Sequence, residues 1–167
     1  KMPKKFISET STAGHKEIIG ETMAKLVLHK NGFNPYSRFL DKEAIDLIVR
    51  NNKNGKVTYN EIQIKYSKKY LDPTENYWFG IQQSTFKPRH YFYFMFICED
   101  ENKILIIPSL TIQDMLKKLK PTIQKGKELG KWNVIIDKQE SDYFLITSKG
   151  YDNIKITHYL NNFGVLK

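Results

Sequence analysis

The chain of 167 residues has a single cysteine, Cys98. One cysteine excludes an intramolecular disulfide and a cysteine-rich zinc site, and it fits a reducing compartment, so we expect a cytoplasmic protein. Cys98 lies in an aromatic run, where a buried hydrophobic role is more common than a nucleophilic one. The four histidines are scattered, with no pair four residues apart on a predicted helix. Zinc-dependent hydrolysis therefore lacks its usual ligands.

Long apolar runs, repeats and phosphate-binding loops are also missing. The longest purely apolar run, Tyr91–Cys98, is far shorter than the ~20 residues that cross a bilayer. No basic stretch followed by an apolar segment opens the sequence, so we expect neither a membrane span nor a signal peptide. The length predicts one domain over residues 1–167, and an aromatic content of 13% is too high for a disordered chain.

Arginine is scarce although the net charge is +9. Only Arg38, Arg50 and Arg89 are present among 27 basic residues, so the remaining 24 are lysines. Lysine carries a point charge without the planar fork of arginine, and it suits phosphate contacts better than base reading. The charge therefore favours a polyanionic partner and indicates nucleic acid only weakly.

Apolar spacing predicts helices and strands in a mixed order that is typical of an α/β fold. A helix is expected over 15–31, with Ile18, Ile19, Met23, Leu26 and Val27 on its apolar face and Gly32 after its end. Further strands are expected over 77–81, 91–98, 103–107, 132–136 and 143–146, while 156–163 is ambiguous. The aromatic run 91–98 could stack on bases, but such a run is more often a central strand, buried on both faces, and we expect that here. A capping box, Thr111 to Asp114, should open a second helix.

The most informative segment is a predicted hairpin. Two alternating segments, 45–50 and 57–65, flank Asn54-Gly55, which is the strongest short signal for a two-residue turn. Such a turn fixes the register, so Asp46 should lie opposite Gln63 and Ile48 opposite Glu61. One face would carry Asp46, Glu61, Gln63 and Lys65. The other would carry Ile45, Leu47, Val49, Ile62 and Ile64 for the first helix to cover.

The polar face of this hairpin has the residue types of a metal-dependent hydrolase. The carboxylate of Asp46 and the amide oxygen of Gln63 are hard ligands that suit Mg²⁺ or Mn²⁺. Lys65 could orient or deprotonate an attacking water, or stabilise charge on a phosphate. Glu21 on the first helix could add a second negative charge. The alternative is an ordinary solvated sheet face, and spacing alone leaves both interpretations open.

These residues resemble the PD-(D/E)XK nuclease superfamily over residues 14 to about 69. The resemblance rests on Gly20-Glu21 in a helix ending at Gly32-Phe33, then on the segments 45–49 and 62–65. The run 91–108 resembles the hairpin that follows in small members. The resemblance implies a restriction endonuclease-like core, a central mixed β-sheet flanked by helices, and Mg²⁺-dependent hydrolysis of DNA. By this resemblance, Asp46 matches the metal-binding aspartate, Lys65 the catalytic lysine, and Glu21 the helix glutamate of Holliday junction resolvases.

Two positions depart from the pattern of this superfamily. No proline precedes Asp46, and Gln63 stands where the second acid usually is. The glutamine resembles a variant found in some restriction-like enzymes and in a group I intron homing endonuclease of this fold. A neutral ligand lowers the affinity for a dication, so either Glu21 compensates or catalysis has been lost. Glu61 shares the face and is a possible substitute acid.

The sequence thus predicts a Mg²⁺-dependent DNA endonuclease of the restriction or homing type, with Glu21, Asp46, Gln63 and Lys65 as its site. The alternatives are a Holliday junction resolvase and a non-catalytic DNA-binding protein on the same fold. The expected backbone contacts are Lys68, Lys69 and Lys87, and the expected base contacts are Gln82, Gln83 and Arg89. Because cutting two strands requires two active sites, we expect a homodimer or a higher homo-oligomer.

Overall fold

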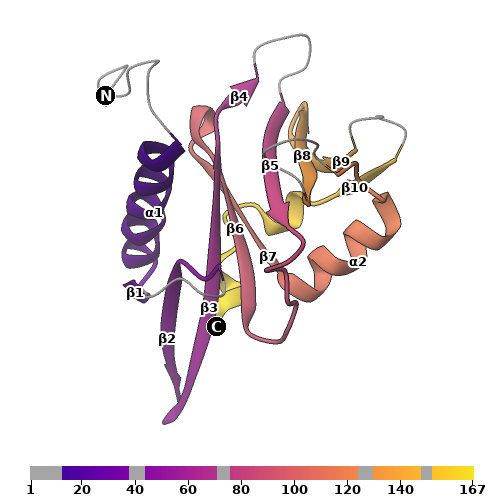
Figure 1. The fold of residues 1–167 in the computed structure, drawn as a ribbon. Coiled ribbons are helices and arrows are strands. Elements are labelled where there is room, and N and C mark those ends of the chain that lie inside the picture. Colours follow the sequence, from indigo (N-terminus) through magenta and orange to yellow (C-terminus); the bar gives the residue numbers. More distant parts are fainter. Residues whose placement is uncertain (1–12, 38–43, 71–75, 124–129, 148–151) are drawn as a thin grey trace.

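A computed structural model describes residues 13–37, 44–70, 76–123, 130–147 and 152–167. Within these residues the chain forms two five-stranded sheets and two α-helices (Figure 1). The first sheet has the order β1 (Asn34–Ser37), β2 (Leu47–Lys53), β3 (Lys56–Ser67), β6 (Phe92–Cys98), β7 (Lys103–Pro108). The second has the order β10 (Asn153–Lys155), β9 (Asp142–Ile146), β8 (Lys131–Gln139), β5 (Asn76–Gln82), β4 (Lys69–Tyr70). The helices are α1 (Ala13–Lys30) and α2 (Ser109–Leu119), and 3₁₀ turns cover Glu99–Glu101, Thr157–Tyr159 and Phe163–Leu166.

The first sheet is mixed, as expected for the predicted α/β fold. β3 and β6 run parallel, while the other neighbouring pairs of this sheet are antiparallel. β6 is the aromatic run, and its side chains enter a core on each face of the sheet: Phe94 and Phe96 on one, Met95 and Ile97 on the other. The prediction of a strand buried on both faces is therefore confirmed for Phe92–Cys98, whereas Tyr91, the first residue of the predicted run, precedes the strand and is 56% exposed.

Different layers cover the two faces of this sheet. α1 packs on one face, where Ala24 and Leu28 join Leu47, Val49 and Ile62 in a buried cluster. The second sheet and α2 cover much of the other face, on the opposite side of the strands from α1 in Figure 1. The second sheet was not anticipated as a separate layer, although three of its strands, β5, β8 and β9, match predicted segments.

The buried face of α1 agrees with the prediction only in part: Met23 and Val27 pack against the buried cluster as predicted, but two other predicted residues do not. Ile18 and Leu26 are 64% and 51% exposed, while the small residues Gly20 and Ala24 face the sheet together with Leu28. Small side chains allow the helix backbone to approach the strands closely, and the larger apolar side chains at 18 and 26 then lie outside the contact. The end of the helix is as predicted, because Gly32 follows it at φ +81° and Phe33 N–H donates to Leu28 O.

The hairpin has the predicted turn and register. Asn54 and Gly55 both have positive φ, 53° and 81°, as a type I′ turn requires, and Ile48 lies opposite Glu61. Ile45 is the exception, since it is buried in the cluster between the two sheets and not beneath α1. The chain bends at Ala44, where φ is +54°, and β2 begins only at Leu47, so strand alternation does not extend back to Ile45.

The start of α2 also differs from the prediction. The helix begins at Ser109, directly after β7, so Thr111 lies inside its first turn and does not cap it. The Ser109 hydroxyl instead donates to Arg89 O and accepts from Arg89 N–H, at 2.9 and 3.0 Å. The ambiguous segment 156–163 contains the 3₁₀ turn Thr157–Tyr159. Among the described helices, none is long and apolar enough to span a membrane.

An acidic turn, Glu99–Glu101, fastens the first sheet to the second. Tyr66 donates to Glu99, Lys69 N–H donates to Asp100, and Tyr143 donates to Glu101. Burial raises the pKa of the Glu101 carboxyl, but hydrogen bonds from Tyr143 and two lysines outweigh burial and lower that pKa overall. These contacts fix the carboxyl end of β3 against β8 and β9.

Candidate active site

β3 continues past the beginning of β2, and along this extension one edge of β3 pairs with no other described strand. The β2–β3 ladder ends at the pair Leu47 and Ile62, whereas β3 continues to Ser67 beside β6. Asp46 stands at the end of the ladder. Its N–H donates to Ile62 O at 2.9 Å, and its carboxylate accepts the N–H of Ile64. The acid therefore caps the exposed edge and is held next to Gln63.

α1 brings a second acid to the same edge. A Cβ added at Gly20 would lie 2.9 Å from the Cβ of Tyr66 on β3, closer than real Cβ atoms approach other atoms. Glycine thus allows the helix to lie directly against the strand, and the next residue, Glu21, is carried to the edge of β3. The carboxylate of Glu21 is partly exposed and lies 3.8 Å from the ammonium of Lys25.

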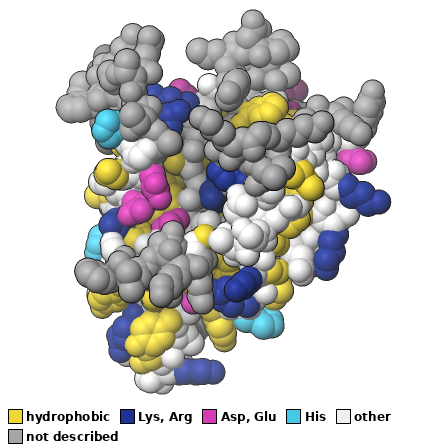
Figure 2. Space-filling model, in the orientation of Figure 1, with side chains coloured by type: hydrophobic (Ala, Val, Ile, Leu, Met, Phe, Trp, Pro, Cys, Tyr) yellow, Lys and Arg dark blue, Asp and Glu magenta, His cyan; other side chains and the backbone are white. Residues whose placement is uncertain are grey.

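The four predicted site residues line a single cavity of about 650 Å³. Glu21 comes from α1, Asp46 from the segment before β2, and Gln63 and Lys65 from β3. The other described residues that line it are Lys16, Glu17, Ala44, Ile64, Tyr66, Gly80, Gln82, Thr85 and Lys131. On the face shown in Figure 2, acidic side chains gather over α1 close to basic side chains.

The sequence did not single out several of these lining residues. Glu17 lies one helical turn before Glu21, so the four-residue spacing of acids on α1 was a usable signal. Lys131 comes from β8 of the second sheet, and Thr85 comes from the turn after β5. No local pattern links them to Asp46, because the packing of one sheet on the other brings them there.

The donor set around the cavity fits a hard divalent cation. It offers the carboxylates of Asp46 and Glu21 and the amide of Gln63, all oxygen donors of the kind Mg²⁺ and Mn²⁺ prefer. Gln63 is only 8% exposed, yet its amide forms no hydrogen bond with another described side chain or backbone group. In the described part of the chain, no three His, Cys, Asp or Glu side chains come together as metal ligands. An ion in this cavity would therefore depend on the glutamine.

The residues predicted to contact DNA are placed differently from one another. Gln82 lines the cavity, and Lys87 is exposed. Gln83 is partly buried and donates its N–H to Gly130 O. By contrast, the ammonium of Lys68 lies 3.7 Å from Glu99, and that of Lys69 lies 3.3 Å from Glu101. The structure thus uses the two lysines after β3 to hold the acidic turn.

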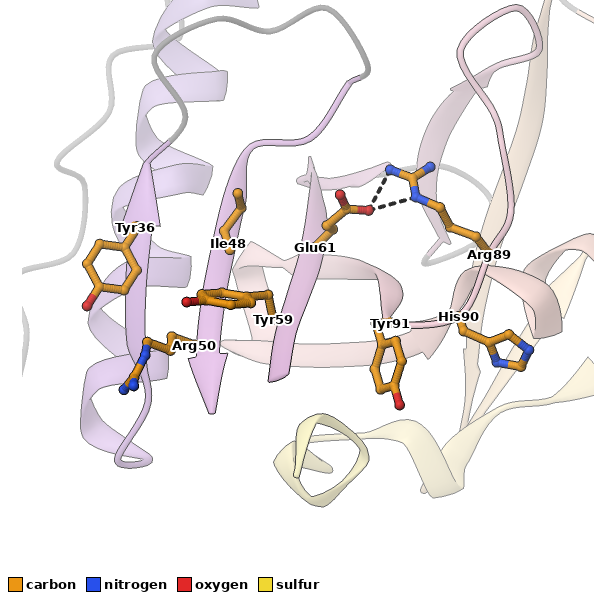
Figure 3. A pocket seen from close by; sticks show the side chains of 8 residues that line it. All are labelled: Tyr36, Ile48, Arg50, Tyr59, Glu61, Arg89, His90 and Tyr91. Carbon is orange, nitrogen blue, oxygen red and sulfur yellow. Dashed lines mark hydrogen bonds and ion pairs between the residues drawn. The ribbon is translucent and has the colours of Figure 1, made fainter. Parts of the chain in front are cut away.

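Arg89 and Glu61 are paired with each other. The guanidinium contacts the Glu61 carboxylate at 2.5 and 2.7 Å (Figure 3). It also lies 4.7 Å from the ring centre of Phe92. Glu61 does not line the cavity of Asp46, so in this structure it does not take the place of the acid missing at Gln63.

Neither a protein-family model nor a curated protein matches the sequence. The structure is similar to that of a bacterial homing endonuclease, I-Ssp6803I, with a TM-score of 0.62 over 94% of this chain and 92% of that chain. The fold is restriction endonuclease-like. At 13% sequence identity the similarity establishes the fold and leaves the chemistry to be argued from the residues.

Proposed function

We propose that the protein is a metal-dependent endodeoxyribonuclease whose site consists of Asp46, Glu21, Gln63 and Lys65. One observation carries the proposal: these four side chains, from three separate segments, line one cavity at the unpaired edge of β3. The restriction endonuclease-like fold supports it, and the net charge of +9 suits a polyanionic substrate.

Each residue has a distinct role in this proposal. Asp46, Glu21 and Gln63 would hold Mg²⁺ or Mn²⁺. When bound, the ion would act as a Lewis acid that neutralises charge on the scissile phosphate. Lys65 points to the same side of β3 as Gln63, because residues two apart on a strand share a face. Its ammonium would orient the attacking water and stabilise the negative charge that develops as the phosphorus–oxygen ester bond breaks.

The same geometry is compatible with two related functions. Glu21 on a helix beside the aspartate is the feature that the sequence shares with Holliday junction resolvases, so a branched DNA substrate is the second candidate. Gln63 leaves the cation with two carboxylates, and this weak donor set supports the third candidate, a DNA-binding protein without catalysis. Cutting both strands would require two copies, so the proposal includes a homodimer or a higher homo-oligomer.

The test is a cleavage assay with Mg²⁺ or Mn²⁺ on linear duplex and four-way junction DNA. We expect cleavage that EDTA abolishes, and a loss of about 100-fold or more in Asp46→Asn and in Lys65→Met. Lys30→Ala, an exposed change at the far end of α1, is the matched control.

The substrates separate the three candidates. Duplex cutting supports the endonuclease, junction-selective nicking supports the resolvase, and binding without cutting supports the non-catalytic protein. Cleavage by Asp46→Asn at the parent rate would remove the assigned site.

A further inference from the structure

A second hollow, of about 670 Å³, lies on the first sheet beside the proposed active site. Its lining comes from β1, β2, β3 and the segment before β6 (Figure 3). The residues are Tyr36, Ile48, Arg50, Tyr59, Glu61, Arg89, His90 and Tyr91. Three of its tyrosines are unusually open to solvent: Tyr36 is 49% exposed, Tyr59 57% and Tyr91 56%. Tyr36, Arg50, Tyr59, His90 and Tyr91 are called the tyrosine–arginine face below.

This hollow adjoins the proposed active site along β3. Strand residues two apart share a face, so Tyr59, Glu61, Gln63 and Lys65 follow one another on the same side of the strand. Glu61 lines the hollow, and the next residue on that side, Gln63, lines the cavity about 7 Å away. A polymer lying in the cavity would therefore reach the tyrosine–arginine face within a few of its repeating units.

The charge of this surface is positive. Among the described residues that line the hollow, Glu61 is the one acid, and its pairing with Arg89 neutralises it. Arg50 is exposed and forms no ion pair with a described residue. A cation beside exposed aromatic rings is a combination that suits nucleic acid, since the cation binds phosphate and the rings pack on bases or sugars.

The backbone conformation that positions one of these rings is strained. Tyr91 has a φ of +62°, which is unfavourable for a bulky side chain. Its carbonyl oxygen accepts the N–H of Glu61 at 2.7 Å, and neighbouring Arg89 is anchored through Glu61 and Ser109. These contacts keep the segment in the strained conformation with the Tyr91 ring exposed. Strain that the surrounding structure enforces is typical of functional positions.

We propose that the tyrosine–arginine face binds the DNA that flanks the cleavage position, with Arg50 on a phosphate and the tyrosine rings against sugars or bases. This inference rests on the proposed function. A second copy of the chain fits the same face less well, because pairing two copies of this face would bring together two positively charged surfaces on chains that each carry +9. None of these residues was among the predicted backbone and base contacts, and only Tyr91 belongs to the aromatic run for which base stacking was the less common alternative.

The experiment measures binding of a fluorescein-labelled duplex by anisotropy over a series of salt concentrations, with Ca²⁺ in place of Mg²⁺. Arg50→Ala should weaken binding and reduce the slope of log affinity against log salt by about one. Tyr59→Ala should weaken binding about tenfold with little change in that slope. Both residues are exposed, so both variants should fold, which circular dichroism checks. Lys30→Ala and Leu26→Ala on α1 are the matched controls for the cation and the apolar side chain.

The outcomes separate this inference from the function on which it rests. If the parent cuts DNA while Arg50→Ala and Tyr59→Ala keep its affinity and salt slope, the inference fails and the nuclease stands. Light scattering identifies one further case. If the two variants bind DNA as the parent does but form assemblies of a different mass from the parent protein, the face is an interface between copies and the inference also fails. If the parent neither binds nor cuts any duplex or junction, the proposed function fails, and the inference fails with it.

Discussion

Two acids at the hairpin, Asp46 and Glu61, were predicted to share one polar face, yet one faces a cavity and the other is held in an ion pair. Glu61 lies inside the β2–β3 ladder and is bound by Arg89 at 2.5 Å. Asp46 lies just beyond the ladder, accepts a backbone N–H from the free edge of β3, and faces the cavity. The position of an acid relative to the end of the paired strands therefore decides whether it supports the fold or is presented to a ligand.

The largest effect should separate these two acids directly. Asp46→Asn should reduce cleavage about 100-fold or more, because the proposed cation would lose a negatively charged ligand. Glu61→Gln should mainly reduce thermal stability, by about 1 kcal/mol, since the partly exposed pair with Arg89 would lose its charge attraction. Single-turnover cleavage and thermal unfolding of both variants measure the two effects. Equal loss of cleavage in the two would contradict the distinction.

The second-largest effect should come from disturbing the close approach of α1 to the free edge of β3. Gly20→Ala would place a methyl group 2.9 Å from the Tyr66 Cβ, so the helix must shift, at an expected cost of about 1–3 kcal/mol. Gly14→Ala on the same helix is the matched control, because its added Cβ would meet no atom within 4 Å. That change should stabilise the protein by up to about 1 kcal/mol.

Urea unfolding of the two glycine variants tests this prediction. Because Glu21 follows Gly20, the Gly20→Ala protein should also need more Mg²⁺ for half-maximal cleavage. Equal stabilities of the two variants would show that the helix does not rest on β3 at Gly20.

Gln63, the neutral ligand beside Asp46, should give a smaller effect, and adding a charge there should improve cation binding where the Asp46 change weakens it. Gln63→Glu should lower the Mn²⁺ concentration for half-maximal cleavage by about tenfold, because a third carboxylate strengthens a hard cation site. Gln63→Leu should raise that concentration by a similar factor or more. Isothermal titration of Mn²⁺ provides a readout that does not depend on cleavage. Unchanged Mn²⁺ affinity in both variants would remove Gln63 from the ligand set.

The smallest effect concerns Glu101, an acid that, like Glu61, is held by structural partners. Its folded-state pKa is lowered, so its carboxylate stabilises the fold above the ordinary carboxyl pKa, and this contribution disappears as the pH falls through the lowered pKa. Glu101→Gln should destabilise the protein by about 1 kcal/mol at pH 7 and by less at acidic pH. Urea unfolding between pH 7 and pH 3 measures the difference, and an equal effect at both ends would contradict the assignment.

How much of the site was predictable depends on the range of the interactions involved. The segment around Asn54-Gly55 predicted both the turn and the proximity of Asp46 to Gln63, because a two-residue turn sets the register of the strands that it joins. The face of Ile45 was predicted incorrectly, since the bend at Ala44 ends the alternation. The capping role of Thr111 was also incorrect, because Ser109, fixed through Arg89, already begins the helix.

The sequence by itself determined the local geometry of this protein: the tight turn, the strand register, the aromatic central strand and the end of α1. Each follows from the conformational preferences of neighbouring residues. Only the tertiary structure decided that Lys69 and Arg89 pair with acids, that Lys131 reaches the cavity, and that three tyrosines remain exposed beside it. Those outcomes depend on which distant segments pack together, and apolar periodicity shows that a face is buried but not which segment covers it.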